Sequence, residues 1–177
     1  GGILSASYAV MQFGCAPMLG NLSDRFGRRP VLLLSMGVLA LDYVVMSVAG
    51  TIWLLFAGRI VAGVAASTHS TALAYMADIT PPEKRAQNFG LISAGFGIGF
   101  ILGPMVGGLL GDLDPRAPFV AAACVAAANF AFGWFVLPES LPKERRRSFD
   151  WRRANPAGGL MQIGKLPGVK ALLAVML

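Results

Sequence analysis

The feature that most restricts the fold of this chain is a series of long apolar runs separated by short polar segments. Crossing about 30 Å of hydrocarbon as a helix takes about 20 residues. Charged residues make up only 14% of the chain, against about 25% in soluble domains, so a polar surface cannot cover all of these runs. The composition excludes a soluble enzyme and a disordered chain and predicts an all-α bundle of transmembrane helices. A sixth run begins near Val169 and reaches Leu177, and the five full runs cover residues 3–19, 31–49, 52–77, 89–110 and 117–137.

Positive charges lie in alternate gaps between these runs. Of the 15 Lys and Arg residues, three lie in 20–30, two in 78–87 and seven in 138–168, whereas the gap at 50–51 has none. Multi-spanning membrane proteins concentrate Lys and Arg in their cytoplasmic loops, so the first three segments are predicted to be cytoplasmic. A nucleic-acid surface needs its charges on one continuous face, and here the apolar runs separate them. The net charge of +6 therefore reflects the orientation of the helices in the membrane, and we expect no nucleic-acid partner.

The most informative polar segment is 20–30, which reads Gly-Asn-Leu-Ser-Asp-Arg-Phe-Gly-Arg-Arg-Pro. A tight turn between two helices needs backbone freedom, which Gly20 and Gly27 can supply. Asp24 is expected near a helix N-terminus, where a carboxylate is favoured, and Arg28 is free to pair with another acid. From these residues alone, a charged turn that only sets topology and a functional turn are equally good interpretations.

This segment resembles the signature loop between the second and third helices of the major facilitator superfamily, a Gly-x-Leu-Ser-Asp-Arg-x-Gly-Arg-Arg pattern. In that family the loop acts as a cytoplasmic gate, because its Asp and Arg make contacts between helix ends. The partner acid, at the end of the fourth helix, would be Asp78. The resemblance places the other gating residues at Gly20, Ser23, Asp24, Arg25, Gly27, Arg28 and Arg29.

The resemblance covers the whole chain and implies its domain organisation. The fold is expected to be the N-terminal six-helix half of a twelve-helix transporter, without its first helix. Residues 1–137 would form the transmembrane bundle with family helices two to six. Residues 138–168 would be the cytoplasmic central linker, and residues 169–177 would begin helix seven, where the chain looks truncated.

Arg59 is an ionisable residue inside a predicted span. Such residues rarely face lipid, which makes a functional role the first hypothesis. The alternative is an Arg whose head group reaches the nearby membrane interface. Helical spacing puts Gly63 and Ser70 on the same face as Arg59. The sequence from Arg59 to Gly63 also resembles the fourth-helix motif of the superfamily, in which the Arg is tied to proton coupling.

Asp42 and His69 are the other titratable residues of interest inside the spans. Carboxyl groups in a low-dielectric environment can exchange a proton near neutral pH, so Asp42 is a candidate for proton coupling. It can instead be a structural acid bonded to a neighbouring helix. Leu41-Asp42-Tyr43 resembles the third helix of tetracycline efflux pumps. His69 is the only histidine; titration, substrate contact and a structural role all remain open for it, and its surroundings depart from the Gly-Ala-Thr-Gly-rich stretch of those pumps.

Glycines recur at strict four-residue spacing from Gly95 to Gly111. They form a smooth stripe on which another helix backbone can pack closely, and a proline beside the stripe removes a backbone hydrogen bond. Part of this stripe resembles the motif that marks antiporters within the superfamily. The residues of this motif are Gly95, Gly99, Gly103, Pro104, Gly107 and Gly108.

Together the resemblances imply a proton-coupled antiporter that exports tetracycline or a related drug across the bacterial inner membrane. Superfamily transporters work by rocking two bundles about a midplane site. The expected partners are the lipid bilayer, protons, the drug and the missing C-terminal half of the same chain. No cofactor is expected, because the proton gradient is the energy source. If the drug is tetracycline, the substrate can be a drug–metal chelate.

Two other functions stay open: a major facilitator carrier for a sugar or another metabolite, and a membrane scaffold that transports nothing. The sequence has no metal-ligand cluster, no Ser-His-Asp set and no phosphate-binding loop, so we expect no enzymatic activity. Cys15 and Cys124 lie inside apolar runs. We interpret both as small hydrophobic residues and not as a disulfide or a metal site.

Overall fold

A computed structural model describes residues 2–150 of the chain. Within these residues there are helices and no strands, which confirms the predicted all-α fold. The remainder of the expected linker, 151–168, and the expected start of helix seven, 169–177, lie outside the described residues. Two short 3₁₀ helices, η1 (Pro82–Lys84) and η2 (Lys143–Arg145), accompany six α-helices: α1 (Gly2–Phe26), α2 (Arg28–Val48), α3 (Ile52–Ala66), α4 (His69–Ile79), α5 (Arg85–Leu113) and α6 (Ala117–Val136).

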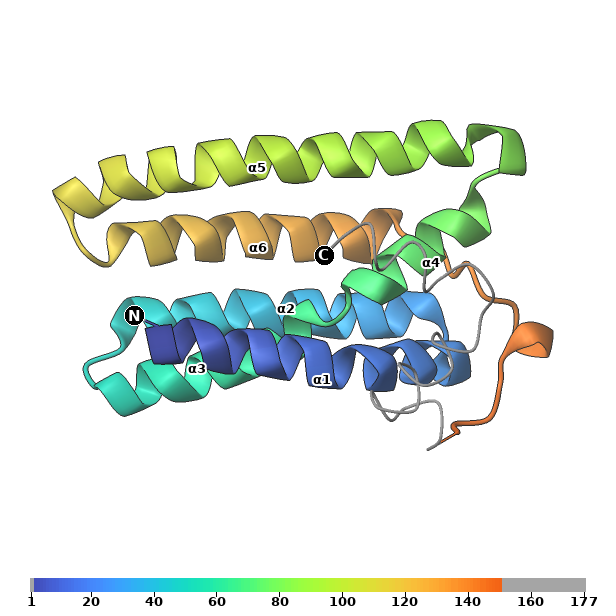
Figure 1. The fold of residues 1–177 in the computed structure, drawn as a ribbon, viewed down its shortest axis with the longest axis horizontal. Helices are drawn as coiled ribbons and strands as arrows, with labels where there is room; N and C mark the ends of the chain where they lie inside the picture. Colours follow the sequence, from blue (N-terminus) through green and yellow to red (C-terminus); the bar gives the residue numbers. More distant parts are fainter. Residues whose placement is uncertain (1, 151–177) are drawn as a thin grey trace, which may run out of the picture.

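The helices form two parts that meet where α2 packs against α6. Figure 1 shows α1, α2 and α3 side by side in one part and α5 and α6 in the other, with α4 leading obliquely between them. Short connections make successive helices run antiparallel. Gly27 alone separates α1 from α2, and only residues 49–51 separate α2 from α3. The most extensive helix contacts are those of α2 with α6 and of α1 with α3.

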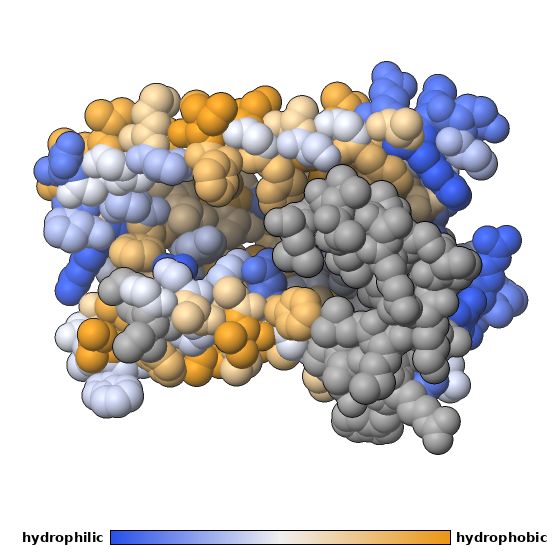
Figure 2. Space-filling model, viewed as in Figure 1, coloured by the Kyte–Doolittle hydropathy of each residue, from blue (hydrophilic) through white to orange (hydrophobic). Residues whose placement is uncertain are grey.

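Within residues 2–150, four helical stretches are long and apolar enough to cross a membrane: Arg28–Val48, Ile52–Ile79, Pro82–Leu113 and Ala117–Val136. The predicted span 3–19 falls within α1, whose 25 residues also give it the length to cross a bilayer. Figure 2 shows hydrophobic residues along the helices and hydrophilic residues gathered toward their ends. Large apolar side chains such as Phe100 and Phe135 are 86% and 85% exposed. Such a surface suits lipid, and the chain is a multi-pass membrane protein.

The predicted helix 52–77 is divided in the structure, because α3 ends at Ala66 and α4 begins at His69. The hydroxyl of Ser67 donates to the backbone oxygen of Gln12 in α1, at 2.9 Å, and to that of Gly63, at 3.0 Å. The Thr68 hydroxyl likewise donates to the backbone oxygen of Ala65. Hydroxyl side chains of this kind compete with the helical hydrogen-bond ladder. The expected common face of Arg59, Gly63 and Ser70 assumed one continuous helix; Arg59 and Gly63 keep their four-residue spacing within α3, and Ser70 lies beyond the break, in α4.

Candidate functional site

The polar segment 20–30 is helical except at Gly27, so the expected tight turn occurs at this single residue. Helix α1 continues to Phe26, and Gly20 lies inside it without making a turn. The reversal occurs at Gly27, whose φ of 108° is the only positive φ among the described residues. Glycine has no Cβ and adopts this conformation readily. The turn therefore places the end of α1 directly beside the start of α2.

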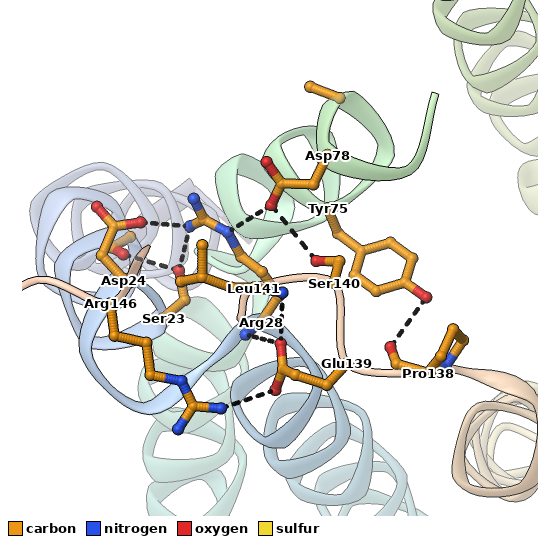
Figure 3. Close-up of polar contacts among 12 residues, drawn as sticks. Ser23, Asp24, Arg28, Tyr75, Asp78, Pro138, Glu139, Ser140, Leu141 and Arg146 are labelled. Atoms are coloured by element: carbon orange, nitrogen blue, oxygen red, sulfur yellow. Dashed lines mark hydrogen bonds and ion pairs between the residues drawn. The ribbon is translucent and has the colours of Figure 1, made fainter. Parts of the chain in front are cut away.

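Arg28 is the centre of a polar cluster that joins the ends of three helices (Figure 3). Its Nη1 lies 2.7 Å from Oδ1 of Asp24 in α1 and donates to the Ser23 hydroxyl at 2.7 Å. Its Nε lies 3.3 Å from Oδ2 of Asp78, at the end of α4. The Arg28 side chain is 13% exposed, whereas those of Asp24 and Asp78 are 36% and 31% exposed. The structure thus brings together the Asp, Arg and partner acid that the resemblance grouped.

The carboxylate at the N-terminus of α2 comes from Glu139 and not from Asp24, which lies in the last turn of α1. Glu139 Oε1 accepts hydrogen bonds from the backbone N–H of Arg28 at 2.9 Å and of Leu141 at 3.1 Å. A carboxylate at this position satisfies a free helical N–H and interacts favourably with the helix dipole. The expectation for Asp24 was wrong because α1 extends about two turns beyond the predicted run 3–19, as far as Phe26.

The segment that follows α6 contacts the helix ends of this cluster, where the sequence predicted only the start of a cytoplasmic linker. Ser140 donates to Oδ2 of Asp78 at 3.4 Å, and the Tyr75 hydroxyl donates to the backbone oxygen of Pro138 at 3.2 Å. The backbone N–H of Arg147 donates to the backbone oxygen of Asp24 at 3.0 Å. The available signal was the sequence Leu-Pro-Glu-Ser-Leu at 137–141, which lies at the end of the predicted apolar run 117–137. Nothing in its spacing indicated which helix ends it contacts.

The two other arginines of the signature lie around this cluster. Arg29 donates through Nη2 to the backbone oxygen of Trp134 in α6, at 2.8 Å. Arg25 lies with its guanidinium carbon 5.2 Å from the centroid of the Phe26 ring, and it makes no ion pair among the described residues. Ser23 is fully buried and donates to the backbone oxygen of Gly20 at 2.7 Å. The signature therefore ties α1 to α2 and α4 through Arg28, and α2 to α6 through Arg29.

Gly27→Ala is expected to destabilise the protein by about 1–3 kcal/mol, the range for a residue forced into a rare backbone conformation. An added Cβ would also collide with the Glu139 carboxylate, whose Cδ would lie 2.8 Å away. The measurement is the thermal unfolding midpoint of the full-length gene product in detergent. Gly50→Ala is the control, because Gly50 has no positive φ and open space for a Cβ. Equal midpoints for the two variants would contradict the assigned turn.

A second site lies between α1, α2 and α3, where Asp42 is 5% exposed. A Cβ at Gly58 of α3 would lie 2.8 Å from Asp42 Oδ1 and 3.0 Å from the sulfur of Met46, so Gly58 leaves the space that the carboxylate occupies. Asp42 Oδ2 is buried and has no hydrogen-bond partner among the described residues. Arg59 directly follows Gly58 in α3, and no direct ion pair joins it to Asp42 in the described part of the chain.

Gly63 and His69, the other two residues predicted for proton coupling or a cavity, lie in different surroundings. Gly63 faces α1, because its Cβ would lie 2.7 Å from the backbone oxygen of Tyr8. His69 is exposed and packs edge-on against Phe96 of α5, with ring centroids 5.0 Å apart. Gly63 therefore lies against α1 and His69 against α5, whereas the glycine beside Asp42 is Gly58. Among the described residues, no three or more of His, Cys, Asp and Glu form a group able to hold a metal ion.

In the described part of the chain, the glycine stripe of α5 has no neighbour from Gly95 to Gly107, and only at Gly111 would a Cβ meet another helix, 3.8 Å from Pro118 of α6. A Cβ built at Gly95, Gly99 or Gly103 meets no heavy atom of another element within 4 Å, and the same holds at Gly107 and Gly108. No residue of α5 is buried among those described, although Pro104 lies inside the helix. The expected close packing of another helix on this stripe is therefore not made by any of the described helices.

Comparison with known proteins covers the whole chain. Residues 1–177 match the family described as Major Facilitator Superfamily. The tetracycline resistance protein, class C, of Escherichia coli is 49% identical over 174 residues, which are 98% of this chain and 44% of that protein. The tetracycline resistance protein, class D, of Salmonella ordonez is 43% identical over 145 residues, which are 82% of this chain and 37% of that protein. The chain thus spans less than half the length of these relatives.

A solved structure shows a similar fold. The crystal structure of the human organic anion transporter MFSD10 (TETRAN) aligns with a TM-score of 0.78 and 34% sequence identity. The alignment covers 87% of this chain and 36% of that one.

Proposed function

Because this chain belongs to the major facilitator superfamily, we propose that it is part of a proton-coupled antiporter that exports tetracycline or a related drug across the bacterial inner membrane. The observation that carries the proposal is the Asp42 carboxyl, which is 5% exposed and has one oxygen without a partner in the described part of the chain. A carboxyl held in this way between helices is suited to taking up and releasing a proton. The identity to tetracycline resistance proteins supports the drug class.

The Arg28 cluster supplies the gate in this proposal. In alternating access, the transporter opens to one side of the membrane at a time. Arg28 links the ends of α1, α2 and α4 through contacts of 2.7 to 3.3 Å. These contacts favour the conformation in which those ends are close together, and a gate of this kind acts through its preference for one conformation over the other.

The remaining elements of the proposal follow from the same mechanism. The proton gradient supplies the energy, with no bound cofactor and no enzymatic step. If the drug is tetracycline, its chelate with a divalent cation is a form that the transporter can accept. The partners are the bilayer, protons, the drug and the C-terminal half of the full-length transporter. Helices α1 to α6 supply the N-terminal bundle, and 138–168 supplies the cytoplasmic linker.

Tetracycline accumulation in cells tests this function. Cells that express the full-length gene product are expected to hold less labelled tetracycline than cells with an empty vector. Dissipating the proton gradient with an uncoupler should raise their content to the vector level, because export against a gradient needs the proton gradient. Equal accumulation with and without the gene would exclude drug export, and export that an uncoupler leaves unchanged would exclude proton coupling.

The alternative function is a major facilitator carrier for another compound, such as an organic anion. The observation that favours it is the 34% identity to the human organic anion transporter. The same cells distinguish the two functions: an organic-anion carrier would move a labelled organic anion and leave tetracycline accumulation at the vector level.

Cysteine labelling tests the proposed sidedness. In a cysteine-free background, a cysteine at Lys143 of η2 is expected to react with a membrane-impermeant maleimide only after the cells are opened, because the Arg28 end of the bundle is proposed to be cytoplasmic. A cysteine at Gly50, in the exposed turn between α2 and α3, is the matched position and should react in intact cells. The reverse pattern would invert the topology.

A further inference from the structure

A groove of about 700 Å³ lies between α2 and α6 and is apolar along most of its length. Its walls include Leu34 and Leu41 from α2 and Trp134 from α6. These side chains are 65%, 64% and 54% exposed, so the groove opens outward from the bundle. At the floor, a Cβ on Gly37 would lie 3.3 Å from the Phe130 ring, which shows how closely the two helices approach there. Because α2 and α6 are both long and apolar enough to span a membrane, this groove runs at the depth of the hydrocarbon.

One end of the groove is charged. It is the end where α2 begins and α6 finishes, and there Arg29, Glu139 and Arg146 line the wall. Arg146 Nη2 lies 3.7 Å from Glu139 Oε2. The Glu139 carboxylate also accepts from the N-terminal N–H of α2, so the helix dipole compensates part of its charge. Two arginines against one carboxylate leave the charged end of the groove positive.

Both arginines have hydrogen-bonding capacity that the chain does not use. The Nε atoms of Arg29 and Arg146 are buried and have no hydrogen-bond partner among the described residues. A buried donor without a partner is unfavourable. Guanidinium groups match the oxygens of a phosphate in geometry as well as in charge. An apolar groove that ends in two such groups, at the level where a membrane helix leaves the hydrocarbon, is complementary to a phospholipid.

We propose that this groove is a binding site for an anionic glycerophospholipid. One acyl chain lies along the apolar wall between α2 and α6, and the phosphate lies at Arg29 and Arg146. The site is separate from the Asp42 site, and it adjoins the Arg28 cluster through Glu139, which contacts both. The proposal does not depend on which compound is transported.

Native mass spectrometry of the full-length gene product tests the site. The purified protein is delipidated in detergent and incubated with phosphatidylglycerol, or with phosphatidylcholine that carries the same acyl chains. We expect one molecule of phosphatidylglycerol to be retained, with an affinity about tenfold higher than that of phosphatidylcholine, because charge-assisted bonds to the two arginines favour the anionic lipid. Glycerol phosphate should give no adduct, because it lacks the acyl chain that fills the groove.

Matched variants locate the bound lipid. The double variant R29Q/R146Q should lower phosphatidylglycerol affinity about tenfold, since it removes the charge-assisted bonds. The double variant K143Q/R145Q removes the same charge from exposed positions of η2 and should leave the affinity unchanged. Val38 also lines the groove. V38W keeps both arginines but fills the groove, so it should also weaken binding.

Three results would overturn the proposal: no phosphatidylglycerol adduct on the wild type, equal retention of the two lipids, or undiminished retention by R29Q/R146Q. If R29Q/R146Q fails to fold, V38W decides the question. Phosphatidylglycerol retention by V38W at the wild-type level would then exclude the groove.

Discussion

Asp24→Asn in the full-length gene product is expected to abolish most drug efflux while the protein remains inserted in the membrane. The change removes the negative partner that lies 2.7 Å from Arg28 Nη1, and it leaves Asp78 at 3.3 Å and the Ser23 hydroxyl in place. Asp24 is 36% exposed, and an exposed ion pair contributes only about 0–1 kcal/mol to stability. Folding and abundance should therefore change little.

Transport is more sensitive than folding to the same change. A gate works through the ratio of two conformations, and each 1.4 kcal/mol of bias changes that ratio about tenfold. The measurement is tetracycline accumulation in cells with matched amounts of each variant in the membrane. Asp24→Glu keeps the charge on a longer side chain and should retain partial activity.

The control for Asp24→Asn is Asp112→Asn. Asp112 is exposed near the far end of α5 and makes no ion pair in the described part of the chain, so its replacement should leave efflux unchanged. Wild-type efflux from Asp24→Asn would show that the Arg28 cluster only orients the protein in the membrane.

Asp42→Asn is expected to eliminate efflux that depends on the proton gradient. Asn has nearly the same shape as Asp, so it can occupy the space beside Gly58 and Met46, but its amide cannot take up and release a proton. Exchange of tetracycline down its own concentration gradient needs no proton transfer and should continue. The measurement is tetracycline transport by reconstituted vesicles, with and without a pH gradient.

Gly58→Ala provides the matching steric variant. It retains the acid, but its new Cβ would lie 2.8 Å from the present position of Asp42 Oδ1, so the carboxyl must move. We expect gradient-driven transport to fall in this variant as well. If Asp42→Asn transported tetracycline against a gradient at the wild-type rate, Asp42 would be only a structural acid.

The sequence predicted best those elements that hydropathy alone specifies. The apolar runs at 31–49 and 117–137 correspond to α2 and α6 with differences of a few residues at their ends. This agreement has a physical reason, since a membrane requires a continuous apolar helix of defined length. The pairing of Asp24, Arg28 and Asp78 also followed from the sequence, because the family signature is long and specific.

Features that depend on tertiary contacts could not be predicted in the same way. The break after Ala66 involves the Ser67 hydroxyl and a backbone oxygen of α1, 55 residues away. Glu139 contacts the N-terminus of α2 across 111 residues, and the Leu-Pro-Glu-Ser-Leu sequence does not specify that partner. The sequence does not predict that residues 20–26 are helical, because a polar composition is typical of a loop. Membrane helices can nevertheless continue beyond the hydrocarbon, as α1 does here.

Drug-dependent proton movement in proteoliposomes tests most directly whether this transporter couples drug efflux to protons. Vesicles that contain the purified full-length gene product are loaded with a pH-sensitive dye and given an acidic lumen, and tetracycline is added outside. In the wild type, tetracycline uptake should be accompanied by a rise in lumenal pH as protons leave in exchange, and Asp42→Asn should abolish that rise. Tetracycline uptake by the wild type with no change in lumenal pH would contradict proton-coupled antiport.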